Sequence, residues 1–447
     1  MDNKTIYALS TVYGKSGVAV IRISGQEVLQ VVKKMTTLDY NKIKPRYAYF
    51  VDLKSIETKE TLDKCLLLYF KSPHSFTGED IVELQIHGSK AVISLVMKNL
   101  SLIKEFRLAE PGEYSKRAFY NGKMDLTQAE GLADLIESET AEQQKYAMRQ
   151  MEGSLKNLYS GWREELLTVL SYLEAYIDFP DEDIPENTVF KLENTVFKLS
   201  KEIKKHLSND NIGERLREGF RVVIVGSPNA GKSSLLNAIV NREAVIVSDI
   251  AGTTRDAVDI YLDLKGYPVM FTDTAGLREV EDVIEKKGIE IAYNKIEESD
   301  LIICLFDSLT DTIQSFDNIS KNFSDKMIFV ANKCDKISEK QKEKFEKQGC
   351  VCISAKYKQG IDNLLDKITT LISSKFTANS NLLITRSRYS EALKETLENL
   401  DNFNLQKEIE LSAEDIRLAA RGLGKITGQI EVDEILDKIF GSFCIGK

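Results

Sequence analysis

Short apolar runs separated by polar turns fill the first 118 residues of the chain. The run at residues 82–86 alternates apolar and polar positions, which is typical of a strand with one buried face. Two longer stretches carry apolar residues at helical spacing. The pattern therefore predicts an N-terminal α+β domain over residues 1–118. Its expected strands are Thr5–Ser10, Val18–Ile23, Tyr47–Val51, Cys65–Phe70 and Ile81–Ile86, and its expected helices are Gln26–Lys34 and Lys90–Lys104.

Helical periodicity dominates residues 119–214 and returns over residues 378–447. Between residues 126 and 176 only three glycines interrupt it. The heptad ENTVFKL then occurs twice in succession, at residues 186–192 and 193–199. Because seven residues are two helical turns, we interpret this duplication as an extended helix of a bundle. Neither helical stretch can bury its apolar stripe alone, so we expect the two to form one discontinuous domain.

Strand-like and helix-like segments alternate over residues 215–377, between the two helical stretches. This alternation predicts a doubly wound α/β fold. The expected architecture is multidomain α/β. It combines an N-terminal α+β domain, a discontinuous all-α helical domain and an inserted doubly wound α/β domain.

A phosphate-binding loop follows the apolar run at residues 221–225. The sequence Gly226-Ser-Pro-Asn-Ala-Gly-Lys-Ser233 has the pattern G-x-x-x-x-G-K-S between a predicted strand and a predicted helix. Its glycines let backbone N–H groups turn toward phosphate oxygens, and the helix start adds partial positive charge. In this pattern Lys232 reaches the β and γ phosphates, and the Ser233 hydroxyl ligates Mg²⁺.

Three further motifs follow, each at the end of a predicted strand. Asp273-Thr-Ala-Gly276 suits a second Mg²⁺ contact, direct or through water, and a loop that senses the γ-phosphate. Asn332-Lys-Cys-Asp335 provides a carboxylate that accepts two hydrogen bonds from guanine, which adenine does not offer. Ser354-Ala-Lys356 supplies backbone N–H groups for the guanine O6 atom. Four motifs in this order predict a domain that binds GTP and hydrolyses it.

Composition narrows the class of protein further. The 447-residue chain has a net charge of −9, which argues against nucleic-acid binding by bulk charge and allows only a local basic face. No apolar run approaches the roughly 18 residues of a membrane span, and the N-terminus lacks the layout of a signal peptide. The six cysteines are scattered, as expected for free thiols in a reducing compartment. We therefore expect a cytoplasmic protein without a membrane partner.

Beyond these generic motifs, the chain resembles the MnmE family of tRNA-modification GTPases, also called TrmE, over its whole length. The resemblance rests on residues 17–25 and 111–130, the loop Asp249-Ile-Ala-Gly-Thr-Thr-Arg-Asp256, and the C-terminal Cys-Ile-Gly-Lys. It implies an N-terminal folate-binding domain that dimerises, a helical domain made from both flanks, and an inserted G domain. It also implies a flavin-bearing partner, MnmG. Together they add an aminomethyl or carboxymethylaminomethyl group to C5 of the wobble uridine of certain tRNAs.

The resemblance also assigns a folate site and a functional cysteine. Arg22, Glu83, Lys123 and Lys447 match positions that contact a formyl-tetrahydrofolate. A carboxylate suits the donor edge of a pterin, and cations suit its glutamyl tail. The alternative is that Arg22 and Glu83 form an ordinary cross-strand pair and Lys123 is a solvated turn residue. Cys444 matches the family's C-terminal cysteine, against the alternative of a small apolar residue in a packing tail.

For catalysis, Leu277 stands where Ras-like enzymes place a water-orienting glutamine, and leucine cannot hydrogen-bond water. The family's switch II glutamate maps to Glu285, which is otherwise one of several solvated acids. The resemblance further implies that K⁺ replaces an arginine finger. Its expected ligands are Asn229, Ser248, Ile250 and Thr253, with Thr254 as the threonine that binds Mg²⁺.

Two functions fit these features: a K⁺-stimulated GTPase of tRNA modification, and a ribosome-assembly GTPase switch of the Era type. The N-terminal block and the terminal Cys-Ile-Gly-Lys favour the first. An assembly GTPase is expected to carry an RNA-binding appendage with a basic patch, and none is apparent in the sequence. The residues predicted to contact GTP are Asn229, Ala230, Gly231, Lys232, Ser233, Ser234, Ser248, Asp249, Ile250, Ala251, Gly252, Thr253, Thr254, Asp273, Thr274, Ala275, Gly276, Asn332, Lys333, Asp335, Ser354, Ala355 and Lys356.

Overall fold

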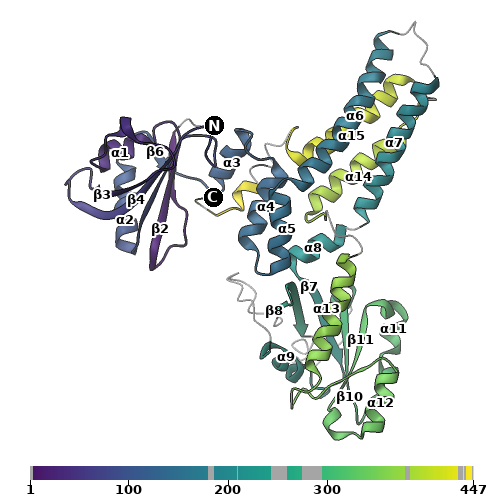
Figure 1. The fold of residues 1–447 in the computed structure, drawn as a ribbon. Helices are drawn as coiled ribbons and strands as arrows, with labels where there is room; N and C mark the ends of the chain where they lie inside the picture. The colour runs from purple at the N-terminus through teal and green to yellow at the C-terminus, as the bar shows by residue number, and fades with distance from the viewer. Residues whose placement is uncertain are drawn as a thin grey trace, which may run out of the picture. The chain divides into compact units, whose positions relative to one another are not determined.

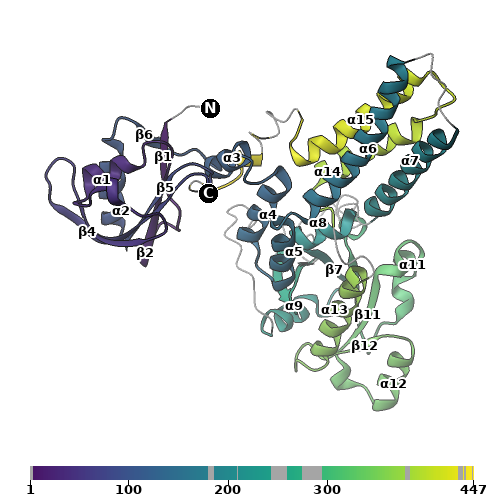
Figure 2. The ribbon, with the colours of Figure 1, turned by 45° about the horizontal axis from the view of Figure 1, so that its top comes forward.

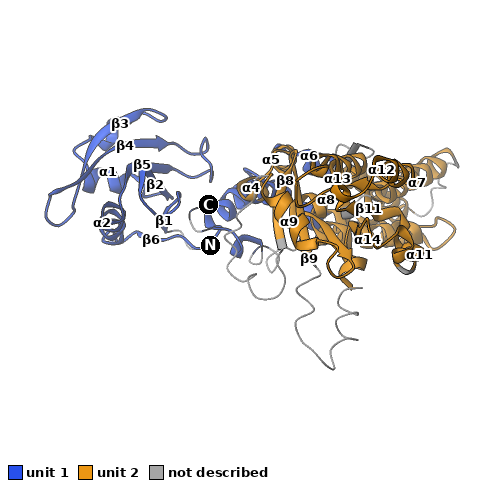
Figure 3. Cartoon of the chain, turned by 90° about the horizontal axis from the view of Figure 1, so that it is seen from below, with its two compact units in different colours: residues 1–133, 151–160, 424–447 blue, residues 134–150, 161–423 orange. Residues whose placement is uncertain are grey.

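The structure is a computed structural model that describes residues 4–179, 186–208, 210–242, 259–273, 294–377, 383–430, 436, 439–444 and 446. Two compact units make up the chain, one of residues 1–133, 151–160 and 424–447 and the other of residues 134–150 and 161–423 (Figure 3). In the described part of the chain, no helix has both the length and the apolar character needed to cross a membrane.

A six-stranded sheet in the order β3-β4-β5-β2-β1-β6 forms the centre of the first unit (Figure 1). β1 and β6 run parallel, whereas the other neighbouring strands are antiparallel. Alternation along β2 buries Ile21 and Ile23 on one face, where two helices contribute Val32 and Val96 to the same core. The expected α+β fold is confirmed. Its elements are β1 (Thr5–Leu9), β2 (Ser16–Ser24), α1 (Leu29–Met35), β3 (Ala48–Lys54), β4 (Thr61–Phe70), β5 (Ile81–Gly88), α2 (Lys90–Ser101), β6 (Phe106–Leu108) and α3 (Glu113–Tyr120).

The nearly continuous helical pattern after residue 126 forms three separate helices: α4 (Leu126–Glu137), α5 (Ala141–Met151) and α6 (Ser154–Asp178). Gly153 adopts a left-handed backbone with φ of 93° and separates α5 from α6. The break between α4 and α5 contains no glycine. There the Gln143 side-chain carbonyl accepts hydrogen bonds from the backbone N–H groups of Glu139 and Thr140, at 3.0 and 3.1 Å. A polar cap thus marks the start of α5, where periodicity gives no signal.

Helices α6, α7 (Glu186–Leu207), α14 (Ser387–Asn402) and α15 (Ile409–Thr427) lie side by side as a bundle (Figures 1 and 2). The duplicated heptad lies in α7, where its Leu192, Val196 and Leu199 are buried. Phe190 and Phe197, one from each copy, stay exposed. The duplication therefore extends a bundle helix, as the spacing predicts, and the segments on either side of the G domain share one bundle.

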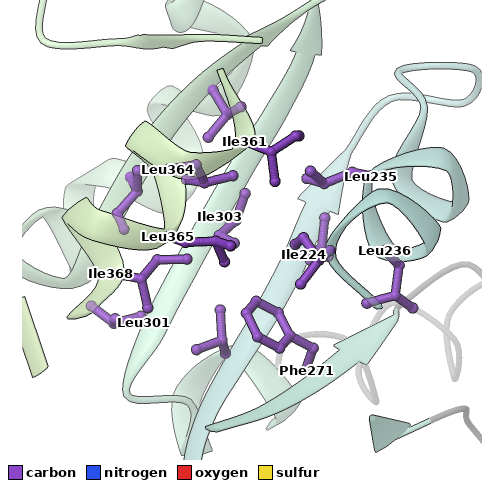
Figure 4. Close-up of a cluster of buried hydrophobic side chains, with 14 of the residues drawn as sticks. Ile224, Leu235, Leu236, Phe271, Leu301, Ile303, Ile361, Leu364, Leu365 and Ile368 are labelled. Atoms are coloured by element: carbon purple, nitrogen blue, oxygen red, sulfur yellow. The ribbon is translucent and has the colours of Figure 1, made fainter. Parts of the chain in front are cut away.

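The second unit also contains a six-stranded sheet, in the order β12-β11-β10-β7-β9-β8. Neighbouring strands are parallel except for β8, which is antiparallel to β9. Ile224 packs on one face with α9 and α13 (Figure 4), and Val223 on the other face with Phe316 and Phe345. Helices on both faces confirm the doubly wound fold. The elements are α8 (Asp210–Glu218), β7 (Phe220–Gly226), α9 (Lys232–Val240), β8 (Asp259–Leu264), β9 (Tyr267–Asp273), β10 (Leu301–Asp307), α11 (Asp317–Phe323), β11 (Met327–Asn332), α12 (Glu339–Lys347), β12 (Val351–Cys352) and α13 (Ile361–Thr377).

Candidate nucleotide-binding site

The four predicted GTP motifs lie at the carboxyl ends of parallel strands. β7 ends at Gly226, β9 at Asp273 and β11 at Asn332, and Ser354 follows the last residue of β12 by two positions. Because these strands are parallel neighbours through β10, their carboxyl ends meet at one edge of the sheet. In open α/β sheets this edge is where ligands bind.

The phosphate loop between β7 and α9 has a backbone that requires glycine. Gly231 adopts φ of 97°, and a Cβ atom there would lie 2.4 Å from the Asn332 Nδ2 atom. The Lys232 ammonium donates across the loop to the carbonyls of Gly226 and Ser227, at 2.9 and 3.2 Å. Asn229 also has a left-handed backbone, with φ of 66°. The loop therefore has the curled shape that phosphate binding by backbone N–H groups needs.

Asn332 connects three loops of the site and is almost completely buried. Its Nδ2 atom donates to the carbonyl of Ala230 in the phosphate loop at 2.7 Å. Its Oδ1 atom accepts from the backbone N–H of Ala355 at 3.0 Å and from that of Lys333 at 2.8 Å. One side chain thus holds the phosphate loop and the two predicted base-recognition loops together.

The carboxylate of Asp335 is oriented by the second base-recognition loop. Its Oδ1 atom accepts a 2.6 Å hydrogen bond from the Ser354 hydroxyl. This contact brings together the two residues that sequence reasoning places on the base. A carboxylate held in this way keeps its other oxygen available as a hydrogen-bond acceptor.

Two aspartates of the site were not predicted from the sequence. Asp307 ends β10, and its Oδ2 atom lies 2.6 Å from the Lys333 ammonium. Although burial opposes it, the hydrogen bond from Lys333 and the charges of Lys333 and Lys336 lower the pKa of Asp307. Asp311 accepts a 2.7 Å hydrogen bond from the hydroxyl of Ser227 in the phosphate loop. The signal that points to Asp307 is an acid directly after the apolar run of residues 301–306.

Several predicted residues lie outside the part of the chain that the structure describes. The backbone of Asp273 ends β9, but its side chain is not described. Ser233 and Ser234 lie in the first turn of α9, and Lys356 follows the Ala355 contact. The predicted residues outside the described ranges are Ser248, Asp249, Ile250, Ala251, Gly252, Thr253, Thr254, Thr274, Ala275, Gly276, Glu285 and Lys447.

In the first unit, two of the predicted folate residues form an ion pair. Arg22 and Glu83 lie directly opposite each other on β2 and β5, with 2.9 Å between Nε and Oε1. The Arg22 guanidinium also lies over the rings of Phe76 and Tyr114, at 5.4 and 5.8 Å from their centroids. The cross-strand alternative is therefore realised in this structure. Lys123 donates to the Pro73 carbonyl at 2.9 Å.

A buried ionic network fixes α3 in the same unit. Glu113 accepts two hydrogen bonds from Arg107, both at 2.7 Å, and two from Arg117, at 2.9 and 3.2 Å. Arg117 also contacts Glu79. Burial alone raises the pKa of Glu113, but these hydrogen bonds outweigh it and lower the pKa. The neighbouring Tyr114 hydroxyl donates to the Arg22 carbonyl at 2.7 Å, so the network anchors the helix beside the ion pair.

The C-terminal segment approaches this region closely. The Cys444 carbonyl accepts from the Gly112 N–H at 3.4 Å, and the Gly446 carbonyl accepts from the Ser10 hydroxyl at 3.0 Å. Gly112, with φ of 63°, leaves no room for a side chain, because a Cβ atom would lie 2.3 Å from the Phe440 carbonyl oxygen. The Cys444 side chain is exposed, which argues against a packing role.

Known proteins match this chain over nearly its whole length. The model for the GTP-binding protein TrmE N-terminus matches residues 5–123, and that for the MnmE helical domain matches residues 126–444. The tRNA modification GTPase MnmE of Rickettsia bellii is 44% identical over 446 residues, which are 99% of this chain and 100% of that protein. Its namesake from Orientia tsutsugamushi is 45% identical over 450 residues, covering 100% of both chains.

Among solved structures, the G domain of the T. maritima FeoB iron transporter matches 34% of this chain and 98% of its own length. Its identity is 25% and its TM-score 0.26, too low to bear on the fold. The family models and full-length relatives agree with the motifs described above. The chain belongs to the MnmE family of tRNA modification GTPases.

Proposed function

We propose that this chain is a K⁺-stimulated GTPase that modifies tRNA together with a flavin-bearing partner of the MnmG type. The reaction adds an aminomethyl or carboxymethylaminomethyl group to C5 of the wobble uridine. The observation that carries this proposal is the hydrogen bond by which Ser354 orients the Asp335 carboxylate, in a chain of the MnmE family. Family membership also favours this function over an Era-type assembly switch.

Within the proposed G domain, residues 215–377, Lys232 binds the β and γ phosphates and stabilises the charge that develops on them. Ser233, Thr254 and Asp273 hold Mg²⁺, the aspartate directly or through water. This set fits the ion, because Mg²⁺ prefers hard oxygen ligands. The parallel pairing of β7 with β9 supports it, since Asp273 lies opposite Ile224 at the strand end that leads into the phosphate loop. Glu285 orients the attacking water.

K⁺ binds beside the phosphates in this proposal, held by Asn229, Ser248, Ile250 and Thr253. Amide, carbonyl and hydroxyl oxygens suit a monovalent cation. Its charge offsets the negative charge that builds up on the β–γ bridging oxygen, which an arginine finger otherwise does.

The proposed N-terminal domain, residues 1–118, binds a formyl-tetrahydrofolate or a related folate. Glu83 accepts from the donor edge of the pterin, with its ion-pair partner Arg22 beside it at the same end of the ligand. Lys123 and Lys447 bind the carboxylates of the tail. The fit is supported by the aromatic rings of Phe76 and Tyr114 beside the Arg22–Glu83 pair. Cys444 has a functional role in the proposed helical domain, residues 119–214 and 378–447.

The open face of the first sheet supports a homodimer. Phe50 on β3 and Leu66 on β4 lie directly opposite each other and are 70% and 39% exposed. Val18 on β2 is 54% exposed. Apolar side chains gathered on an exposed sheet face mark a contact with another protein surface. A second copy of this cytoplasmic chain is the partner that we propose.

Nucleoside analysis of tRNA tests the function. A strain that lacks its own MnmE-type GTPase receives this chain and the MnmG-type flavoprotein of the same source, and mass spectrometry then quantifies C5-modified uridine. The chain restores the modification, whereas Lys232→Ala does not, because the phosphates lose their main cationic contact. If the unchanged chain hydrolyses GTP but leaves the wobble uridine unmodified, the tRNA assignment is wrong and the GTPase assignment stands.

A further inference from the structure

A short turn after β10 contacts both halves of the nucleotide pocket. It begins at Asp307 and closes through a 2.9 Å hydrogen bond from the Asp311 N–H to the Asp307 carbonyl. Asp311 holds the hydroxyl of Ser227 in the phosphate loop at 2.7 Å. Asp307 holds the ammonium of Lys333 in the base-recognition loop at 2.6 Å. Neither aspartate belongs to the four motifs that predict the site.

The geometry at Asp307 is that of a side chain fixed in place. Its Oδ1 atom accepts from the Leu309 N–H at 3.1 Å, which leaves Oδ2 directed at Lys333. The side chains of Asp307 and Lys333 are 13% and 32% exposed, so water screens the pair only in part. Lys333 has a left-handed backbone with φ of 63°. The ion pair therefore fixes a lysine whose backbone conformation is also unusual.

A lysine in this position can contribute to base recognition only if its stem is ordered. Lys333 lies between Asn332, which joins the loops, and Asp335, which faces guanine. Its apolar stem suits the flat face of a purine, but an unrestrained lysine loses rotamer entropy when it is fixed. A pair already formed in the protein removes part of that cost from binding.

We propose that Asp307 is a positioning residue for guanine-nucleotide binding, which acts through the ammonium of Lys333 and does not touch the nucleotide. This inference rests on the proposed function, because it takes the pocket to bind GTP. It adds a specificity element outside the GTP-binding motifs.

A double-mutant cycle on the full-length chain tests the proposal, with dissociation constants measured for fluorescent GDP and GTP analogues in Mg²⁺. Asp307→Asn keeps the acceptor for the Leu309 N–H and loses the charge. Lys333→Met keeps the stem and loses the ammonium. We expect each variant to weaken binding of both nucleotides roughly tenfold, because part of the cost of ordering the Lys333 side chain then falls on nucleotide binding. The double variant should also lose roughly tenfold, because both changes remove the same contact.

Asp311→Asn is the matched control, because it removes the same charge from the same turn but contacts Ser227. The fold-losses in nucleotide affinity from Asp311→Asn and Lys333→Met should multiply in the double variant. A second control, Glu343→Gln at an exposed position on α12, should bind nucleotide like the unchanged protein. Asp307→Ser serves as a second variant if Asp307→Asn does not fold. If the Asp307 and Lys333 effects multiply, the inference is overturned and the nucleotide site stands. If Lys333→Met and Asp335→Asn both bind like the unchanged protein, the nucleotide site itself is misassigned.

Discussion

At the residue scale, the proposed base selection depends on one carboxylate, that of Asp335, whose orientation is set from outside its own motif. Ser354 donates to one oxygen of Asp335, and Asn332 ties both base-recognition loops to the phosphate loop. The carboxylate can therefore act only as an acceptor toward the base. The proposed preference for guanine can therefore be tested by replacing one carboxylate oxygen of Asp335 with an amide nitrogen.

We predict that Asp335→Asn converts the pocket from guanine to xanthine. The amide puts a donor against the exocyclic amine of guanine, so affinity for GTP falls by about 100-fold or more. Xanthosine triphosphate carries an oxygen at that position and binds the variant better than GTP does. Competition titrations with the two nucleotides measure the switch. A variant that still prefers GTP contradicts the assignment of Asp335.

The motif residues were predictable because each motif is a local pattern at the end of one apolar run. Asn332, Asp335 and Ser354 all reach the strand ends that the sequence assigns to them. Asp307 and Asp311 were not, because their contacts join segments 26 and 84 residues apart. A single sequence gives no information on which acidic side chain contacts which distant lysine or hydroxyl group. In the ionic network around Glu113, the contact of Arg117 with Glu79 also joins distant segments, 38 residues apart.

At the element scale, a partly buried histidine lies where α6 packs on α7. His206 lies edge-on to Trp162, with 5.6 Å between ring centroids, and Trp162 donates to Glu202 at 3.0 Å. Burial lowers the pKa of His206 to about 4. The unfolded chain therefore binds more protons than the folded chain between the ordinary histidine pKa of about 6.5 and pH 4.

We predict that this helix pair loses stability as the pH falls through that window. Stability is complete above pH about 6.5, and the loss from His206 approaches about 3 kcal/mol near pH 4. Trp162 is the only tryptophan of the chain, so its fluorescence during urea unfolding reports on this contact. His206→Phe keeps a ring at the site and removes the titration. If the variant and the unchanged chain lose stability equally between pH 7 and pH 4.5, the histidine does not contribute.

Elements differed in how well periodicity located them. The buried face of α7 could be predicted from the duplicated heptad, because the apolar positions of two complete repeats fall on one side of the helix. The break between α4 and α5 was missed, because it is set by side-chain hydrogen bonds of Thr140 and Gln143 that cap the start of α5. Strand β6, three residues long, was missed too, because it is too short to show alternation.

At the scale of the whole molecule, the proposed mechanism couples hydrolysis to the meeting of two G domains across their nucleotides. In this proposal a second G domain completes the K⁺ cage, whose expected ligands Ser248 and Ile250 lie outside the described residues. Asn229 contributes a phosphate-loop ligand whose backbone, at φ of 66°, glycine adopts without strain. Asn229→Gly therefore removes the amide oxygen and preserves the loop.

We predict that GTP hydrolysis is at least tenfold faster in K⁺ than in Na⁺, because the smaller ion does not fill the cage and leaves the bridging oxygen without its compensating charge. Asn229→Gly abolishes this difference and binds GDP as before, since Lys232 and the loop N–H groups remain. Glu285→Ala loses turnover but still dimerises in K⁺ with GDP and aluminium fluoride, because it acts on water and not on the cation. Phosphate release and light scattering in each salt measure both effects. Equal rates of hydrolysis in K⁺ and Na⁺ for the unchanged chain contradict the cation mechanism. If Glu285→Ala stays monomeric under these conditions, Glu285 is needed for dimerisation as well as for turnover.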